Sequence, residues 1–340
     1  MQYPKPIVSK AAMVIGSLIV FASAAAFAAE VGGKPEKTEV IVTYAQPSGA
    51  FTPIWLAHEA GLFKKYGLNA TLQLLTPQVS AQAVISGQAD FYTDGPDLIN
   101  ARLHGGQVKY FGGTIQQLVF QIWAAKEIKT MQELKGKAIA ASTPRAALDT
   151  ATREALKKHG LVPDKDVQIL YVQSVPAILS AILGGKTAAG TLSAPNTIKA
   201  REAGLNMLVD VGKLNIPAFQ VAYGATEEYL KNNPNTVYAF LKAVATGVAL
   251  SQQDPAAAKR AIAKYAKIGD GPTIDATYDA FAPYWEANLA VRPAAIRGQF
   301  EYIDEKEFPK VKNADPKVFY DNSFVDALSK SGFLKSLGMK

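Results

Sequence analysis

The sequence of 340 residues contains no cysteine. This absence excludes disulfide bonds, Cys-ligated zinc, iron–sulfur clusters and thiol catalysis. It also excludes attachment of a lipid to an N-terminal cysteine. A chain of this length can bury a core that is stable without disulfides, so the absence does not argue against secretion.

Histidine and clustered basic residues are also scarce. The histidines His58, His104 and His159 lie far apart, and none has the spacing of a zinc-binding helix, so we expect no metal site. Lysine and arginine alternate with acidic residues and form no basic run with interleaved aromatics, so nucleic-acid binding is not expected. Because no phosphate loop, dinucleotide fingerprint or G-x-S-x-G motif occurs, we expect no cofactor.

The composition is that of a globular protein, and the length is sufficient for two domains of ordinary size. Hydrophobic residues make up 49% and charged residues 19% of the chain. The formal net charge is +7, which falls to +5 without Lys5 and Lys10. A mild positive charge says little about the ligand.

Residues 1–28 have the pattern of a cleaved signal peptide. Lys5 and Lys10 precede an uncharged stretch, and Ala26-Phe27-Ala28 provides small residues before a cleavage site. The alternative is an uncleaved membrane anchor, although the second half of the stretch is mostly alanine. We therefore predict export to the periplasm and a flexible lead-in over residues 29–38.

The remaining chain alternates between strand-like and helical segments up to about Thr226 and is helical afterwards. This alternation predicts an α/β fold with parallel-rich sheets that are covered on both faces. The expected strands are 39–44, 70–75, 91–93, 109–114, 120–124, 138–141, 167–171, 188–192 and 207–211. The later helices are expected at 227–231, 236–251, 255–267, 274–288, 293–300 and 323–329.

Two extended pieces predict crossings between lobes. Segments 109–114 and 120–124 have no helix between them, and 219–223 is a second extended piece. We therefore expect a discontinuous lobe 1, made of residues 39–115 plus 221–340, and a lobe 2 of residues 116–220.

Six of the expected strands lead into a Ser, Thr or Asp that can cap the next helix. In an open parallel sheet these junctions share the edge at which ligands bind. Free N–H groups at helix starts suit anions. The alternative is that the side chains are ordinary helix caps. The six junctions contain Thr52, Ser80, Asp94, Ser142-Thr143, Ser174 and Ser193.

Five phrases occur in order along the chain: PIWLAHEAGLFKKYGL (53–68), QAVISGQADF (82–91), LKGKA (134–138), AILGGKTAA (181–189) and YLKNNPNTVYA (229–239). Together they resemble the nitrate/sulfonate/taurine group of periplasmic binding proteins, which shares its domain with proteins that bind or make the thiamine pyrimidine precursor. Ala188 stands where the family usually has Asp. The resemblance covers most of the chain after the leader.

The resemblance implies a type II periplasmic binding protein with two lobes, a two-strand hinge and a helical C-terminal region. It implies a non-catalytic receptor that closes on a small molecule and delivers it to an ABC permease in the inner membrane; we expect a monomer. Carried over by position, the ligand contacts are Ser48, Gly49, Phe51, Ser80, Thr93, Asp94, Gln116, Gln117, Thr143, Arg145, Ser174, Ser193 and Phe219.

Arg145 favours a small organic anion, because a guanidinium at the start of a helix can clasp a carboxylate or sulfonate. Asp94 could instead bind an amine or ring N–H, or simply cap a helix. The second ligand hypothesis is a thiamine-precursor-like heterocycle read by Asp94, Gln116 and Gln117. Enzymes of this fold make the thiamine pyrimidine with a cysteine-rich motif, which this chain lacks. A periplasmic sensor would have the same sequence features.

Overall fold

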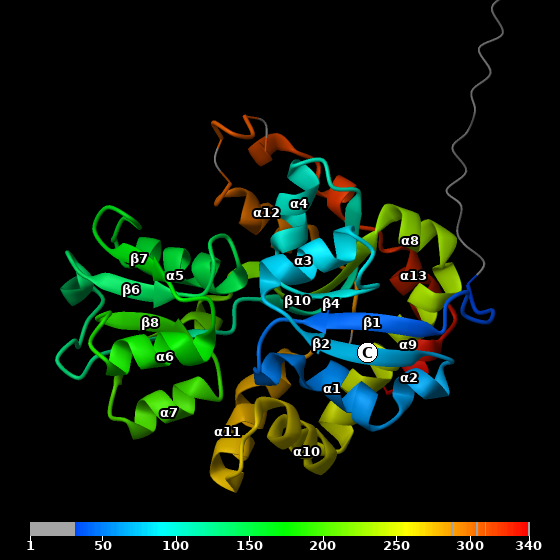
Figure 1. Ribbon diagram of the computed structural model, residues 1–340, viewed down its shortest axis with the longest axis horizontal. Helices are drawn as coiled ribbons and strands as arrows, with labels where there is room; N and C mark the ends of the chain where they lie inside the picture. Colours follow the sequence, from blue (N-terminus) through cyan, green and yellow to red (C-terminus); the bar gives the residue numbers. More distant parts are fainter. Residues whose placement is uncertain (1–30, 287, 304, 310, 339–340) are drawn as a thin grey trace, which may run out of the picture.

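A computed structural model describes residues 31–338 except 287, 304 and 310, so the predicted signal peptide lies outside the described residues. Figure 1 shows two lobes side by side. In the part of the chain that is described, no helix combines the length and apolar character needed to cross a membrane.

Lobe 1 contains one layer of strands. β1 and β2 pair in parallel, and β10 lies between β3 and β4 and runs antiparallel to both. A parallel bridge between Val42 and Phe91 joins these two groups. The strands are β1 (Glu39–Tyr44), β2 (Asn69–Leu74), β3 (Tyr92–Asp94), β4 (Val108–Gln117) and β10 (Pro217–Thr226).

Helices cover both faces of this layer and bury its apolar side chains. The packing is built around aromatic rings such as Phe91, Phe111 and Phe240, which are fully buried against one another. The helices are α1 (Thr52–Glu59), α2 (Leu62–Lys65), α3 (Pro77–Ile85), α4 (Asp97–Leu103), α8 (Glu227–Asn232), α9 (Pro234–Gln253), α10 (Pro255–Ala266), α11 (Gly271–Phe281), α12 (Pro293–Phe300), α13 (Ser323–Lys330) and α14 (Phe333–Ser336).

Lobe 2 is a five-stranded sheet in the order β7-β6-β8-β5-β9 with its own apolar core. β5 runs antiparallel to its neighbours, whereas β6 is parallel to β7 and β8. The elements are β5 (Gln121–Ala124), β6 (Ala138–Ala141), α5 (Ala147–Lys158), β7 (Gln168–Tyr171), α6 (Val175–Leu183), β8 (Ala189–Leu192), α7 (Asn196–Glu202) and β9 (Asn206–Asp210).

Two long strands, β4 and β10, carry the chain between the lobes. They pair antiparallel from Val108–Thr226 at one end to Gln117–Pro217 at the other, with register shifts in between. Paired strands bend more easily than a packed core, so they can act as the hinge of lobe closure.

The expected α/β class, with two lobes and a helical C-terminal region, is confirmed. The strand positions agree to within a few residues, because apolar β-branched runs and glycine stops are local signals. One expected helix was too long: α11 ends at Phe281, followed by a single 3-10 turn, Ala282–Tyr284. Pro283 cannot donate the backbone hydrogen bond that would continue the helix.

The described part of the predicted flexible lead-in, residues 31–38, is hydrogen-bonded to lobe 1. The Glu36 carboxylate accepts from the backbone N–H groups of Asn235 and Thr236, at 3.1 and 2.9 Å, at the start of α9. The Asn235 Oδ1 accepts from Gly32 and Gly33, each at 2.9 Å. Residues 31–38 are thus part of lobe 1, because a carboxylate satisfies free donors at a helix start.

Candidate functional site

A pocket lies between the lobes at the carboxyl ends of β1, β3, β6 and β8, the edge at which open α/β sheets bind ligands. We call it the inner pocket. Residues of both lobes and of the hinge contribute to it, so its shape depends on how the lobes meet. It is lined by Gln46, Ser48, Ala50, Phe51, Pro77, Asp94, Phe120, Ser142, Ala146, Ala147, Leu148, Ser193 and Gln220.

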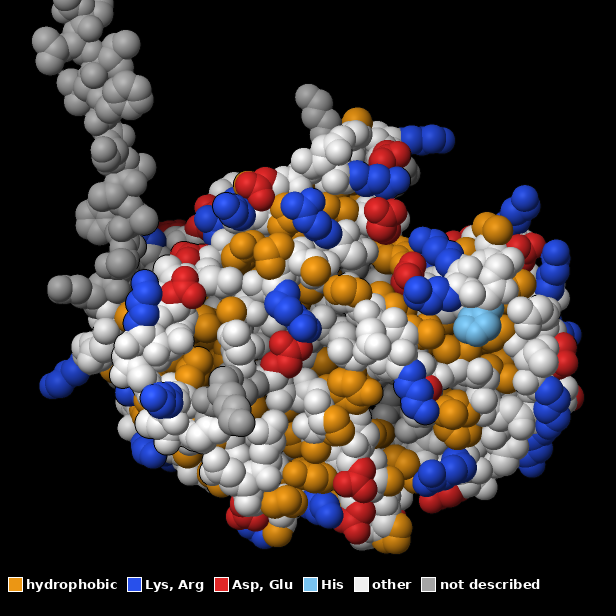
Figure 2. Space-filling view, turned by 180° about the vertical axis from the view of Figure 1, so that it is seen from behind, with side chains coloured by type: hydrophobic (Ala, Val, Ile, Leu, Met, Phe, Trp, Pro, Cys, Tyr) orange, Lys and Arg blue, Asp and Glu red, His pale blue; other side chains and the backbone are white. Residues whose placement is uncertain are grey.

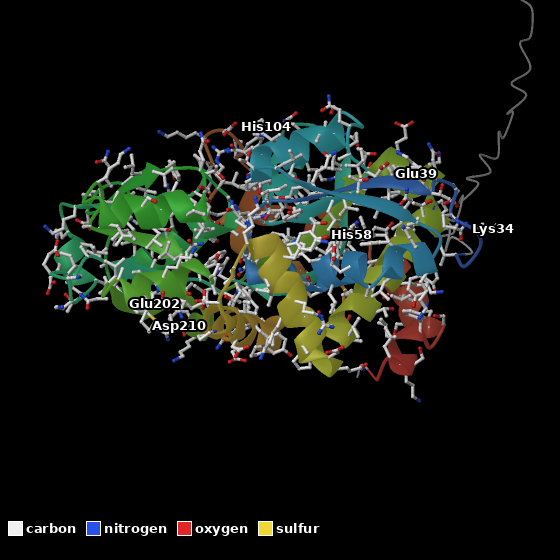
Figure 3. The ribbon with its side chains drawn as sticks, turned by 60° about the horizontal axis from the view of Figure 1, so that its bottom comes forward. Lys34, Glu39, His58, His104, Glu202 and Asp210 are labelled. Atoms are coloured by element: carbon white, nitrogen blue, oxygen red, sulfur yellow. The ribbon has the colours of Figure 1, made fainter. Side chains whose placement is uncertain are left out.

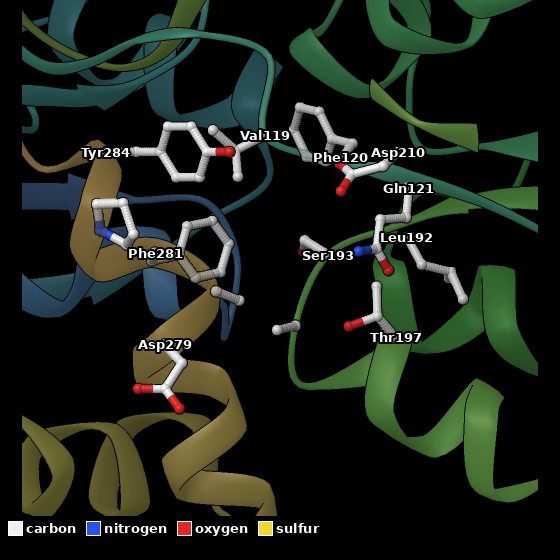
Figure 4. A pocket seen from close by; sticks show the side chains of 13 residues that line it. Val119, Phe120, Gln121, Leu192, Ser193, Thr197, Asp210, Asp279, Phe281 and Tyr284 are labelled. Carbon is white, nitrogen blue, oxygen red and sulfur yellow. The ribbon is translucent and has the colours of Figure 1, made fainter. Parts of the chain in front are cut away.

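A second space, the outer pocket, lies beside it and shares Phe120 and Ser193 with it. Its volume is about 230 Å³. Figure 4 shows Asp279, Phe281 and Tyr284 of lobe 1 facing Phe120, Asp210 and Thr197 across the gap. The full lining is Val119, Phe120, Gln121, Leu192, Ser193, Ala194, Thr197, Asp210, Asp279, Ala280, Phe281, Pro283 and Tyr284.

The lobes are in contact on both sides of the inner pocket. On one side the Gly49 N–H donates to the Ala194 carbonyl across the gap at 3.4 Å. On the other, a Cβ on Gly95 would lie only 3.2 Å from the Ala147 Cβ. The space left between them has a volume of about 30 Å³. This is room for one or two water molecules, so a larger solute enters only if the lobes separate.

A segment of lobe 1, residues 293–303, reaches across to α5 of lobe 2. The buried Gln299 side chain accepts from the Thr150 hydroxyl at 3.1 Å and donates to the Arg145 carbonyl at 3.1 Å. The Tyr302 hydroxyl donates to Glu154, and Lys157 lies over the Tyr302 ring at 4.4 Å. These contacts hold the lobes together outside the pocket.

Asp94 is the charged residue of the inner pocket. It is the last residue of β3, pairs with Ala222 of β10, and is 7% exposed. Among the described residues, its Oδ2 atom has no hydrogen-bond partner. Burial, together with the nearby charge of Asp97, raises the pKa of Asp94 well above its ordinary value.

A hydrogen-bonded group behind Asp94 fixes its surroundings. The Tyr92 hydroxyl donates to Asp97 Oδ2 at 3.0 Å, and the Tyr110 hydroxyl donates to the Gly95 carbonyl at 2.9 Å. Burial raises the pKa of Asp97 to about 6. Neither tyrosine donates its hydroxyl to Asp94 Oδ2, and that buried oxygen belongs to a residue that lines the pocket.

Four residues predicted from the sequence line the inner pocket: Ser48, Phe51, Asp94 and Ser193. Gly49 lies next to them and contacts the opposite lobe through its N–H. Asp94 makes no cap on α4, which begins at Asp97 without a side-chain cap. The alternative interpretation of Asp94 as a helix cap was therefore wrong.

Five predicted residues lie outside the pocket lining and have other partners or surroundings. Ser80 is inside α3 rather than at its cap, because the helix already begins at Pro77, and it bonds to Thr43. Gln116 donates to the Ala290 carbonyl and accepts from the Arg292 N–H, at 2.8 and 2.7 Å. Thr93, Gln117 and Phe219 are also placed elsewhere: Thr93 is fully buried, Gln117 donates to the Gly212 carbonyl, and Phe219 packs on Tyr110.

The expectation that Thr143 and Arg145 open a helix was wrong, because α5 begins at Ala147. Arg145 has a left-handed backbone, with φ of 65°, and its guanidinium pairs with Glu307 of lobe 1 at 3.3 Å. It lines a separate hollow together with Pro144 and His104, and neither the inner nor the outer pocket. Thr143 is buried beside the pocket residue Ser142, and Ser174 caps α6 through its hydroxyl.

Sequence reasoning missed Gln46, Phe120, Ser142 and Gln220 as pocket residues. Ser142 directly follows β6 and was weighed only as a cap. Phe120 and Gln220 come from the hinge, where the Gln220 side chain bonds to the backbone of Val119 on both sides. Their position next to the predicted crossings was the signal that could have revealed them.

Elsewhere in the described chain, charged side chains that gather pair with one another, as Arg153 does with Asp149 and Asp164. Figure 3 shows His58 and His104 on separate parts of lobe 1. No group of three or more metal-ligating side chains was found among the described residues. Figure 2 shows basic and acidic side chains interspersed over one face of the molecule.

Comparison with known proteins gives a consistent match in sequence and fold. A family model described as "NMT1/THI5 like" matches residues 48–258. A search of curated proteins found no match. Solved structures match along most of the chain, at low sequence identity, and therefore establish the fold alone.

Three of these structures illustrate the match. The periplasmic aliphatic sulphonate-binding protein SsuA from Escherichia coli is 20% identical, with a TM-score of 0.66, over 84% of this chain and 92% of that one. The periplasmic nitrate-binding protein NrtA from Synechocystis is 14% identical, with a TM-score of 0.69, over 89% and 92%. A Candida albicans protein described as having the generic periplasmic binding protein fold is 12% identical, with a TM-score of 0.64, over 86% and 95%.

Proposed function

This chain belongs to the NMT1/THI5-like family, and on that basis we propose that it is the solute-binding receptor of an ABC importer. It captures a small molecule between its lobes in the periplasm and delivers it to a permease. One observation carries the proposal: a pocket at the strand ends of both sheets is enclosed by lobes joined through two hinge strands. Lobe closure then changes the surface that a permease meets.

The sequence of events follows from the geometry. When the lobes separate about β4 and β10, the contacts of Gly49 with Ala194 and of Gln299 with α5 break and the pocket opens. A solute that bridges both lobes, between Ser48 and Asp94 on one side and Ser142 and Ser193 on the other, stabilises the closed form. No chemical step is required of these residues.

The anion hypothesis from the sequence rested mainly on Arg145. The SsuA and NrtA neighbours bind sulphonate and nitrate, which supports that class by analogy. The placement of Arg145 against Glu307 does not support it, because the guanidinium already has a carboxylate partner outside the pocket. The ligand class is therefore argued below from the pocket itself.

Solute binding is tested by a thermal-shift screen of the mature protein, with small-angle scattering on any hit. A ligand at 100 times its dissociation constant adds about 2.7 kcal/mol of stability. Phe120→Ala, which removes a wall of both pockets, is expected to lose the shift, whereas Phe333→Ala on α14 retains it. A shift that survives Phe120→Ala and leaves the radius of gyration unchanged contradicts binding between the lobes.

Transport is tested in cells. Deletion of the gene is expected to abolish uptake of the labelled solute, and the wild-type gene to restore it. Unchanged uptake by cells whose protein still binds the solute would refute the importer role and favour a sensory receptor.

A further inference from the structure

The two pockets between the lobes are lined by acidic residues and by no basic ones. Asp94 is the charged side chain of the inner pocket, and Asp210 and Asp279 are those of the outer pocket. Neither set of lining residues contains lysine, arginine or histidine. The chain as a whole shows the opposite bias, with a formal net charge of +7. The acidic lining is therefore a local feature of the cleft.

The geometry around Asp94 shows what the pocket lacks. The carboxyl group is more than nine-tenths buried, and Oδ2 has no partner within the described part of the chain. A buried acceptor without a donor is costly, so proteins rarely keep one without a reason. The side chain neither caps α4 nor bonds to the tyrosines behind it. Because Asp94 lines the inner pocket, a donor that enters this pocket can supply the partner.

The groups around it suit a flat or apolar body attached to that donor. Phe51 and Phe120 line the inner pocket, and Phe281 and Tyr284 line the outer one. Aromatic faces attract cations as well as apolar surface. The serine hydroxyls of Ser142 and Ser193 can accept or donate further hydrogen bonds.

An anion would find no partner of opposite charge in the inner pocket. A sulfonate or carboxylate in the inner pocket would find no lysine or arginine in the lining, and a buried charge without a partner of opposite sign is costly. Arg145, the cation expected there, is held by Glu307 on the outside.

Given the receptor function proposed above, we infer that the captured solute is a small amine or amidine that donates its N–H groups to Asp94. A protonated amine supplies the charge and the donors that the buried carboxylate lacks. Its apolar part lies against the aromatic walls.

The test uses four probes that share one ring and differ in the charged group: benzylamine, benzamidine, benzoate and benzenesulfonate. Binding to the mature protein is measured by calorimetry and thermal shift. We expect the two cations to bind and the two anions not to bind. Asp94→Asn keeps the shape of the side chain, removes its charge, and is expected to weaken cation binding by about 30-fold or more. Asp326→Asn, an exposed acid on α13, is the matched control and leaves binding unchanged.

The outcomes separate this inference from the receptor function. Binding of benzoate or benzenesulfonate that Asp94→Asn leaves unchanged or improves refutes the amine class and keeps the receptor. Cation binding that is equal in wild type and Asp94→Asn, with both proteins folded by circular dichroism, also refutes it. Failure of all four probes, and of the broader solute screen, counts against the receptor function itself.

Discussion

At the scale of single residues, the protonated form of Asp94 favours stability, whereas its ionised form favours binding of a cation. Its raised pKa means that the folded protein holds the Asp94 proton more tightly than the unfolded chain does. The stability that this proton provides is complete below the unfolded pKa of about 3.9 and is lost as the pH rises toward the folded pKa. Asp97, with a folded pKa of about 6, adds the same trend between about pH 4 and pH 6.

Asp94→Asn is therefore expected to raise the free energy of unfolding at pH 7 by about 1–3 kcal/mol, because the neutral amide takes up no proton when the chain folds. The gain should shrink toward zero at pH 4. Urea unfolding at the two pH values measures it. A variant that is equally destabilised at both would show that Asp94 has a structural partner in the folded state.

Cation binding should also depend on pH through the same residue. A cation pairs with the ionised carboxylate, so binding releases the Asp94 proton and the affinity rises with pH until Asp94 of the free protein is ionised. The titratable groups that surround it are Asp97 on α4, Tyr92 on β3 and Tyr110 on β4. Calorimetry of benzylamine in buffers of different ionisation enthalpy measures the released protons. A flat affinity profile, without proton release, contradicts this linkage.

Arg145 provides a contrasting prediction. Its ion pair with Glu307 is partly exposed, with 36% and 42% of the side chains accessible. Such pairs contribute about 0–1 kcal/mol. Arg145→Ala is expected to change solute affinity by less than about fivefold, measured by calorimetry. A loss of 2–5 kcal/mol would instead restore the anion hypothesis, because it is the cost of breaking a buried charge pair.

At the scale of elements, the sequence predicted the strands and helices better than the junctions between them. Ser80 and Thr143 follow strands as caps do, yet α3 and α5 begin elsewhere. Proline at position 77 starts α3 early, and the left-handed Arg145 delays α5. Apolar periodicity is local, whereas the choice of helix start depends on a few backbone angles.

The same limit applies to the site. The sequence placed Ser48, Asp94 and Ser193 at one edge, because their strands end there. It did not reveal which side chains turn into the pocket. Gln116 faces Ala290 and Arg292, and Phe219 packs into the core, since both orientations depend on tertiary contacts that the sequence pattern does not contain.

The segment of residues 293–303 stabilises the closed form of the protein. Gln299→Leu removes the hydrogen bonds to Thr150 of α5 and to the Arg145 carbonyl, and it leaves both groups without this partner. Each buried group left unpaired costs about 1–3 kcal/mol, so the open form becomes more populated and the apparent affinity falls. Gln253→Leu, whose amide bonds to Leu337 within lobe 1, is the control. An unchanged radius of gyration in Gln299→Leu would show that this bridge does not hold the lobes.

At the scale of the whole molecule, closure depends on close approach at Gly95. A side chain there meets Ala147 of lobe 2 and the Phe219 carbonyl, at 3.2 and 3.3 Å from the Cβ position. Gly95→Val is thus expected to act as a wedge. Overpacking of this kind costs about 1–3 kcal/mol, which corresponds to a fall of about 5–150-fold in affinity.

Gly269→Val is the matched control, because nothing lies within 4 Å of its Cβ position. Calorimetry with the solute and small-angle scattering without it compare the two variants. A Gly95→Val protein that binds as tightly as wild type would show that the lobes need not come this close.

The two-part construction of lobe 1 also determines when each half of the molecule can form during synthesis. Lobe 2 is one uninterrupted stretch, so it can fold as soon as β9 has left the ribosome. Lobe 1 must wait, because Glu36 pairs with Asn235, 199 residues later, and β3 needs β10 beside it. A nascent chain that stops short of β10 therefore carries the strands of lobe 2 together with open edges on β3 and β4, which only β10 can pair. Such a chain is a substrate for chaperones and proteases, whereas the full-length chain closes those edges.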